Sequence, residues 1–152
     1  MNDKHLSEEK AVIFHHTVAQ LMFLLTRVRR DIQTTVSFLT TRVKKPDADD
    51  WGKLKCVLQY LMGTRTLKIR LTIDNMHCIK WLVDASHGVH WDCKGHTGAA
   101  MTLGKGAMSS FSHKHKQNAN SSTKSELYGV YDALPKVIWS LEFPRAQGHN
   151  VS

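Results

Sequence analysis

Two acidic residues in the second half of the chain are placed where a protein could use them for chemistry. Asp84 follows a short apolar run, at the expected end of a strand, and Glu126 lies one turn into a helix expected to begin near Ser121. Two carboxylates from different elements that meet over a sheet can hold Mg²⁺, which prefers oxygen ligands. Taken singly, each acid also has an ordinary structural explanation, a turn residue for Asp84 and an early-helix residue for Glu126.

A polar segment just before this helix carries a cluster of basic residues. They are His113, Lys114, His115 and Lys116, within a stretch from 112 to 122 that we expect to be an exposed loop. Such a loop can contact phosphates, and the neighbouring Phe111 offers a ring on which a base can stack. The alternative is a solvated surface loop without a ligand.

Histidine and cysteine recur at every third position after Asp84. These residues are His87, His90, Cys93 and His96, and imidazole and thiolate groups are zinc ligands. Their spacing departs from the paired-ligand pattern of structural zinc sites. A zinc-stabilised domain is therefore the weakest of the hypotheses considered.

The elements that must position these residues follow from the hydrophobic periodicity. Before residue 64 the apolar residues recur at helical spacing, which predicts one helix from Ser7 to about residue 30, a second from Asp31 to Pro46 and a third from there to Gly63. After residue 64 the period changes to two, and a last helix is predicted from Ser121 to Pro144, interrupted at Pro135. Strands are predicted at 66–73, 78–83, 98–103 and 107–111.

This order of elements predicts an α+β fold with N-terminal helices, an antiparallel β meander and a helix. We expect a helical segment at 1–64 and a sheet domain at 65–152. The chain has 152 residues, enough to bury a core without disulfide or metal staples. Its apolar runs are too short for a membrane span.

Five motifs follow one another along the chain in a characteristic order. They read Arg-Asp-Ile (30–32), Trp-Gly-Lys-Leu-Lys (51–55), Val-Leu-Gln-Tyr-Leu-Met-Gly-Thr (57–64), Val-Asp-Ala-Ser-His-Gly (83–88) and Ser-Ser-Thr-Lys-Ser-Glu-Leu-Tyr (121–128). Together they resemble the ribonuclease H domain of copia-type retrotransposon polyproteins and the helical connection between polymerase and ribonuclease H. The resemblance runs from about residue 15 to residue 143, and this collinear coverage carries more weight than any one motif.

The resemblance implies a partial ribonuclease H-like fold in which Asp84 matches the first metal-binding aspartate and Glu126 the helical glutamate. The intact family domain hydrolyses the RNA strand of RNA/DNA hybrids with two Mg²⁺ ions. Lys124 departs from the pattern, since the family usually has an acid there, although not a catalytic one. The family's third and fourth acids lie in later segments that do not occur before Ser152, and the polymerase's paired-aspartate strand is absent.

We therefore interpret the chain as a fragment of a retroelement reverse transcriptase and ribonuclease H. Two acids give each Mg²⁺ too few protein oxygens, so no cleavage is expected from the chain alone. Whether the chain is an enzyme is therefore left open. The alternative is a non-catalytic nucleic-acid-binding remnant. The expected partners are an RNA/DNA hybrid and the remainder of the polyprotein, with no membrane.

Charge and cysteine content agree with this interpretation. The net charge is +8, from 21 basic and 13 acidic residues, which favours a polyanionic partner. The three cysteines are scattered and odd in number, which is typical of free thiols in a reducing compartment. The expected location is intracellular, in cytoplasmic retroelement particles with access to the nucleus.

Overall fold

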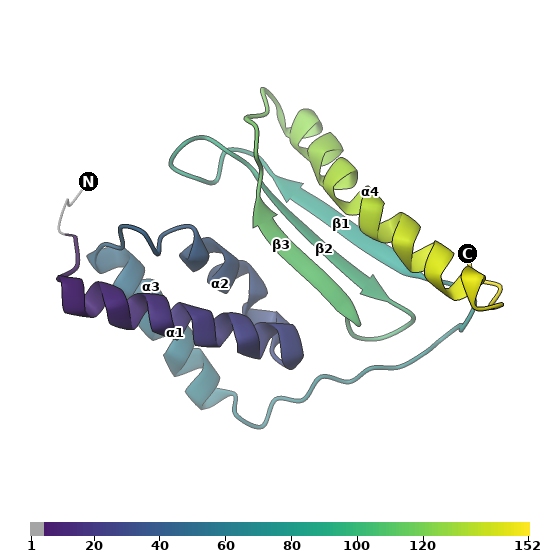
Figure 1. Cartoon of the computed structure of the whole chain (residues 1–152), viewed down its shortest axis with the longest axis horizontal. Helices are drawn as coiled ribbons and strands as arrows, with labels where there is room; N and C mark the ends of the chain where they lie inside the picture. Colours follow the sequence, from purple (N-terminus) through teal and green to yellow (C-terminus); the bar gives the residue numbers. More distant parts are fainter. Residues whose placement is uncertain (1–4) are drawn as a thin grey trace. The chain divides into compact units, whose positions relative to one another are not determined.

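Helices occupy the first half of the chain, and a sheet with one long helix occupies the second half (Figure 1). The computed structural model describes residues 5–152, which fall into two units divided between Ile69 and Arg70. In this described part the architecture is α+β, with four α-helices, one short 3₁₀ helix and one three-stranded antiparallel sheet. None of the helices within residues 5–152 combines the length and hydropathy needed to cross a bilayer.

The helical unit forms around one apolar core. Its elements are α1 (Glu8–Arg27), η1 (Arg30–Ile32), α2 (Gln33–Thr40) and α3 (Ala48–Gly63). The apolar faces predicted from the helical spacing meet one another, because burying them removes their surface from water. The buried side chains of this core are Phe14, Val18, Leu21, Leu25, Ile32, Val36, Leu39, Leu54 and Val57.

The second helix is shorter than the sequence predicts. Asp31 was expected to cap it, but the carboxylate of Asp31 instead accepts a hydrogen bond from Nη2 of Arg29 at 2.8 Å. Because this charge-assisted pair holds Asp31 within the 3₁₀ turn, the α-helix begins only at Gln33. It also ends at Thr40, six residues before Pro46, so proline is not what stops it.

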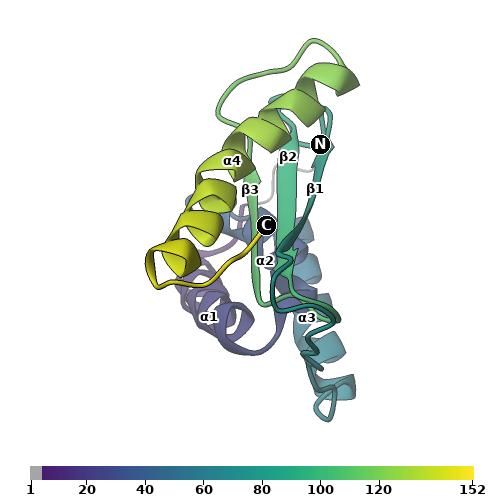
Figure 2. The same ribbon diagram turned by 90° about the vertical axis from the view of Figure 1, so that its right-hand side faces the viewer.

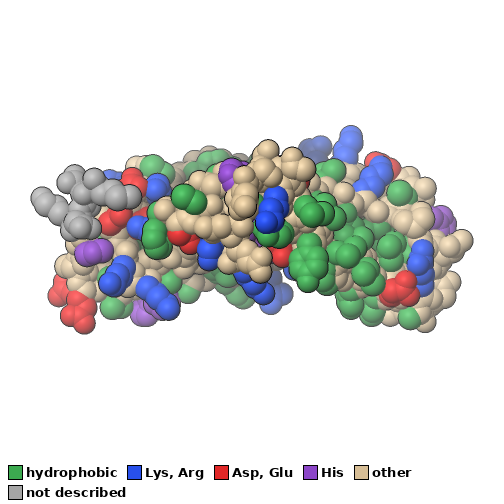
Figure 3. Space-filling model, turned by 90° about the horizontal axis from the view of Figure 1, so that it is seen from above, with side chains coloured by type: hydrophobic (Ala, Val, Ile, Leu, Met, Phe, Trp, Pro, Cys, Tyr) green, Lys and Arg blue, Asp and Glu red, His purple; other side chains and the backbone are tan. Residues whose placement is uncertain are grey.

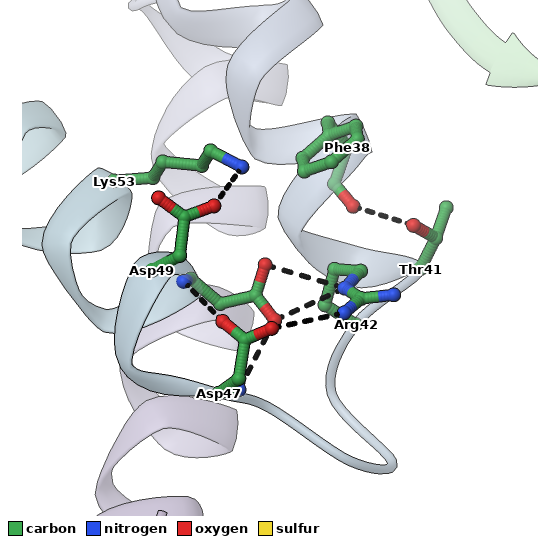
Figure 4. A network of polar contacts seen from close by, with 7 residues as sticks. Phe38, Thr41, Arg42, Asp47, Asp49 and Lys53 are labelled. Carbon is green, nitrogen blue, oxygen red and sulfur yellow. Dashed lines mark hydrogen bonds and ion pairs between the residues drawn. The ribbon is translucent and has the colours of Figure 1, made fainter. Parts of the chain in front are cut away.

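The start of α3 is held by a reciprocal capping box and a buried ion pair (Figure 4). Oδ1 of Asp47 accepts from the backbone N–H of Asp50 at 2.8 Å, and Oδ2 of Asp50 accepts from the backbone N–H of Asp47 at 3.2 Å. Nε of Arg42 also donates to Oδ2 of Asp50 at 3.0 Å. The Asp50 side chain is 2% exposed, so its charge depends on these partners.

The sheet unit is a meander covered on one face by a helix. Strands β1 (Lys80–Ser86), β2 (His96–Thr102) and β3 (Ser109–Lys114) pair antiparallel in the order β1-β2-β3. The register places Asp84 opposite Gly98 and His96 opposite Lys114. Helix α4 (Ser122–Ala146) packs along β1 and β2 on one face of this sheet (Figure 2).

Small residues let α4 lie close to the sheet. Its buried positions are Ser125, Gly129, Ala133 and Ser140. A Cβ at Gly129 would come within 2.9 Å of the Cβ of Ala85, closer than such atoms approach, so glycine is needed there. Nε1 of Trp81 donates to Oγ of Ser140 at 3.0 Å and fixes the other end of the contact.

The strand predicted at 66–73 is not formed. Its apolar side chains at Leu67, Ile69, Leu71 and Ile73 are 43–58% exposed. Part of the segment is hydrogen-bonded to the β2–β3 connection, where the backbone N–H groups of Thr72 and Asp74 donate to the carbonyls of Lys105 and Leu103. Alternation alone does not make a strand when no layer covers the apolar side of the segment.

Helix α4 runs through both prolines that were expected to interrupt or end it. Pro135 lies in its interior, and the helix continues past Pro144 to Ala146. Pro135 leaves the carbonyl of Tyr131 without its helical donor, and Tyr131 is 74% exposed, so water can satisfy that carbonyl. The expected cap is confirmed, since Oγ of Ser121 accepts from the N–H of Lys124 at 3.2 Å.

We predict that Asp50→Ala lowers the free energy of unfolding of the helical unit by about 2–4 kcal/mol, because it removes half of the capping box and leaves Arg42 without its buried partner. The matched control is Asp49→Ala in the same turn, whose ion pair with Lys53 is exposed and should contribute below about 0.5 kcal/mol. Urea unfolding followed by circular dichroism measures both. Equal effects of the two substitutions would contradict the assignment.

Candidate functional site

Asp84 lies inside β1, on the face of the sheet that points away from α4. Side chains alternate between the two faces of a strand, and Trp81 contacts α4 through Ser140, so the odd-numbered residues of β1 face the helix. Asp84 is therefore on the opposite face, where it is exposed. The sequence predicted that Asp84 would lie at the end of this strand. The strand instead continues to Ser86, so Asp84 lies within it.

Glu126 lies just after the first turn of α4, on the flank of the helix nearest β1. Ser125 points into the sheet and is fully buried, while Asp132 on one flank bonds to His113 of β3. With 100° between successive residues, Glu126 falls on the opposite flank. Its side chain is exposed.

The two acids belong to adjoining segments, but no contact joins them. Nδ1 of His87 is hydrogen-bonded to Oγ of Ser125 at 3.1 Å, which ties the exit of β1 to the start of α4. Across residues 5–152, neither the Asp84 nor the Glu126 side chain has a hydrogen bond or ion pair, and no three His, Cys, Asp or Glu side chains are arranged to hold a metal ion.

The donor set does not fit the two Mg²⁺ ions that the family resemblance implies. Mg²⁺ demands a near-octahedral set of oxygens at about 2.1 Å. Here one carboxylate is on the far face of β1 and the other on the flank of a helix, and both are open to water. These two residues alone do not form a two-metal centre.

Ser152 is hydrogen-bonded to the segment that leads into β1. The backbone N–H of Ser152 donates to the carbonyl of His77 at 2.7 Å, and the N–H of Ile79 donates to the carbonyl of Ser152 at 2.9 Å. Ser152 thus bonds to the two residues on either side of position 78. This is the hydrogen-bond pattern of parallel strands. Ser152 therefore sits in parallel register just before β1.

The sheet face that carries Asp84 contains a chain of buried histidines. Nε2 of His90 is hydrogen-bonded to Nδ1 of His96 at 3.0 Å, and Nε2 of His96 is hydrogen-bonded to Oγ of Ser112 at 2.6 Å. Burial lowers the pKa of His90, and the charge of Lys114 adds to this effect. Burial lowers the pKa of His96 to about 4, with the charge of neighbouring histidines adding to the effect. Both rings are therefore neutral at neutral pH.

The four basic residues expected on one exposed loop have different surroundings. His113 and Lys114 belong to β3, which is longer than predicted. Nζ of Lys114 is 2.7 Å from Oδ1 of Asp92, and burial, which alone would raise the pKa of Asp92, is outweighed by this lysine, so that pKa is lowered. Lys116 is exposed, without an ion pair among the described residues.

His115 is buried, not on the surface. Its Nε2 is hydrogen-bonded to Oγ1 of Thr97 at 2.7 Å, and its Nδ1 has no hydrogen-bond partner within the described part of the chain. Burial lowers its pKa. Gly95 makes room for the ring, because a Cβ at that position would lie 2.6 Å from Nδ1 of His115.

Asp132 is the polar residue of this unit that the sequence analysis missed. Its Oδ2 is 3.0 Å from Nε2 of His113 and 3.5 Å from Oγ1 of Thr97, so it links α4 to β2 and β3. The helical spacing could have indicated its position, because Asp132 follows Ser125 and Gly129 on the face of α4 that packs against the sheet.

The histidine and cysteine repeat does not converge on one point. His90 and His96 bond to each other, whereas His87 bonds to Ser125 and Cys93 is exposed in a turn with φ of 58°. The zinc hypothesis therefore gains nothing from the arrangement of these residues.

We predict that the sheet unit loses stability as pH falls. A histidine whose folded-state pKa is lowered favours the neutral form, so its contribution is present above its ordinary pKa of 6.5 and is lost as pH falls towards about 4. For His96 the loss is about 3 kcal/mol in total. Hydrogen exchange of β2 amides across this range measures it.

The variant His96→Gln should reduce this pH dependence, because glutamine keeps a polar partner for Ser112 but does not titrate there. The exposed His149 supplies the control His149→Gln, which should leave the dependence as it is. Identical pH profiles for both variants would contradict the assignment to His96.

Comparison with known proteins relates the chain to a transposon sequence. Over 101 residues, or 66% of this chain, it is 32% identical to a putative transposon Ty5-1 protein of Saccharomyces cerevisiae, of which it spans only 33%. Over 131 residues, 86% of this chain and 92% of the relative, it is 28% identical to secreted RxLR effector protein 161 of Plasmopara viticola. No protein-family model and no solved structure matches. The similarity to the Ty5-1 protein indicates a retrotransposon-related sequence.

Proposed function

We propose that this chain is a segment of a copia-type reverse transcriptase in which the connection helices precede the first half of a ribonuclease H-like domain. As it stands, it binds RNA/DNA hybrids without cleaving them. The intact domain of the family would supply two-metal hydrolysis, for which Asp84 and Glu126 are the first two acids. The proposal includes the remainder of the polyprotein as a partner.

The observation that carries this proposal is the order of elements around β1. The strand bearing Asp84 begins the meander, α4 bearing Glu126 returns along one face, and Ser152 lies in parallel register beside residues 77–79, directly before β1. A strand continuing from Ser152 would run alongside β1 and past Asp84. The family resemblance implies a further acid on such a fourth strand.

The proposed contact with the hybrid is electrostatic and centres on Lys116. Lys114 is paired with Asp92, His113 is hydrogen-bonded to Asp132, and His115 is buried. These three side chains are therefore less available to a phosphate than Lys116 is. Lys116 is exposed just beyond β3 and can approach a phosphate without breaking an ion pair. The net charge of +8 attracts the polyanion from a distance.

The alternative is a nucleic-acid-binding remnant that lacks ribonuclease activity even in a longer protein. The position of Asp84 on the face away from α4 favours it, because the two acids then do not converge. Adding the downstream coding sequence distinguishes the two ideas. Mg²⁺-dependent cleavage by the longer protein supports the enzyme segment, and binding alone supports the remnant.

For the 152-residue chain we predict hybrid binding that weakens with salt and no cleavage in Mg²⁺. Binding follows from the net positive charge, and the lack of cleavage follows from the incomplete donor set. A labelled RNA/DNA hybrid measures both, by fluorescence anisotropy and by gel. Cleavage that Asp84→Asn abolishes would overturn the non-catalytic part, and a complete lack of salt-dependent binding would overturn the rest.

A second prediction concerns the site of contact. Lys116→Ala should weaken binding and reduce the slope of log K against log salt by about 1, because one phosphate contact is lost. The matched control is Lys105→Ala, an exposed lysine before the opposite end of β3. If Lys105→Ala lowers the slope and Lys116→Ala leaves it unchanged, the contact has been misplaced.

A further inference from the structure

Helix α4 is apolar on two opposite faces. The inner face carries the small residues that pack against the sheet. The outer face, about 180° away around the helix, carries a second row of large apolar residues. We call this row the outer stripe, and it consists of Leu127, Val130, Tyr131, Leu134 and Ile138.

The outer stripe is open to water at all five of its positions. Its side chains are 47–74% exposed, and hydrophobic side chains gather over α4 in the right-hand part of Figure 3. Five such side chains present on the order of 500 Å² of apolar surface, comparable to the largest patch of a typical monomer. A helix with two apolar faces is usually enclosed between two layers.

The spacing within the outer stripe suits another helix as the covering layer. Leu127, Tyr131, Leu134 and Ile138 are separated by steps of four, three and four residues. This is the repeat by which two helices interlock their side chains along a common seam. Pairing two such stripes would bury on the order of 1,000 Å², the lower bound for a specific interface.

Charges at the two ends of the stripe favour a second copy in antiparallel orientation. Lys124 and Glu142 are both exposed, and they lie nine residues before and nine after residue 133, near the middle of the stripe. They also lie on the same flank of the helix. Antiparallel pairing sets Lys124 of each copy opposite Glu142 of the other, because the same flanks then meet. Parallel pairing places the two copies of this flank on opposite sides of the seam, so the pair does not form. The exposed bond from Arg145 to Glu142 competes only weakly.

A hollow and a stacked aromatic pair lie beside the stripe. The N-terminal half of the stripe borders a cavity of about 580 Å³, which His115 and Tyr128 also line. Trp139 is 63% exposed and stacks on Phe143 at 5.0 Å. In the antiparallel arrangement Trp139 of one copy lies at the same level along the seam as Leu127 of the other, because the residue numbers of each facing pair sum to 266.

We propose that the outer stripe of α4 is a self-association surface on which a second copy of this chain docks through its own α4, antiparallel to the first. The contact is isologous, so it closes as a dimer and does not propagate. This inference stands independently of the proposed function.

The test is the mass of the purified chain by light scattering after gel filtration, over a range of concentrations. We expect twice the 17.3 kDa of one chain. Leu134→Glu should raise the dissociation constant at least about tenfold, because it places a charge at the centre of the seam. The control Leu82→Glu, at a 67% exposed leucine on the other face of the sheet, should leave the dimer intact. Circular dichroism checks that both variants keep their helix content.

The charge pair tests the orientation. Lys124→Glu alone should weaken the dimer, and the double variant with Glu142→Lys should restore it. A chain that is monomeric at all concentrations overturns the proposal and leaves the stripe to another part of the chain or another protein. Equal dissociation by Leu82→Glu and Leu134→Glu also overturns it, as does failure of the double variant to restore the dimer.

Discussion

The close packing of α4 against β1 and β2 is the contact on which the rest of the sheet unit depends. Gly129 meets Ala85 with no space for a side chain, and Trp81 reaches across to Ser140. Once this contact is fixed, strand alternation decides which residues face the helix and which face away. It thereby places Asp84 on the far face, Glu126 on a flank and the outer stripe in solvent.

The same contact explains why polar groups are buried in this unit. Thr97 lies beneath α4, and it bonds to His115 and approaches Asp132, so one helix–sheet interface encloses an imidazole, a hydroxyl and a carboxylate. On the opposite face His96 is enclosed by His90 and Ser112. Neutral imidazoles can be buried in this way because each ring nitrogen can donate or accept one hydrogen bond. Hydrogen-bonded polar side chains therefore contribute to the stability of both faces of the three-stranded sheet.

Local chemistry made several features predictable from the sequence. Ser121 caps α4 as expected, since an N-cap needs only its own side chain and the next turn. Trp81 and Val83 share a face of β1 as expected, although the strand begins and ends later than predicted. The alternating segment at 66–73 was misjudged, because whether an apolar row is buried depends on what covers it.

The candidate site was less predictable than the fold because its geometry depends on tertiary contacts. The motifs identified Asp84 and Glu126, but only the packing of α4 shows that they lie on different sides of β1. Likewise, the sequence places His115 beside Lys116, and only the sheet shows that one is buried and the other exposed. The most direct test of this account is a nuclear Overhauser measurement on the labelled chain. Strong cross-peaks are predicted from the Gly129 α-protons to the methyl groups of Ala85 and Thr97. If Gly129 instead shows no contact with β1 or β2, the helix is not seated on the sheet and the account is contradicted.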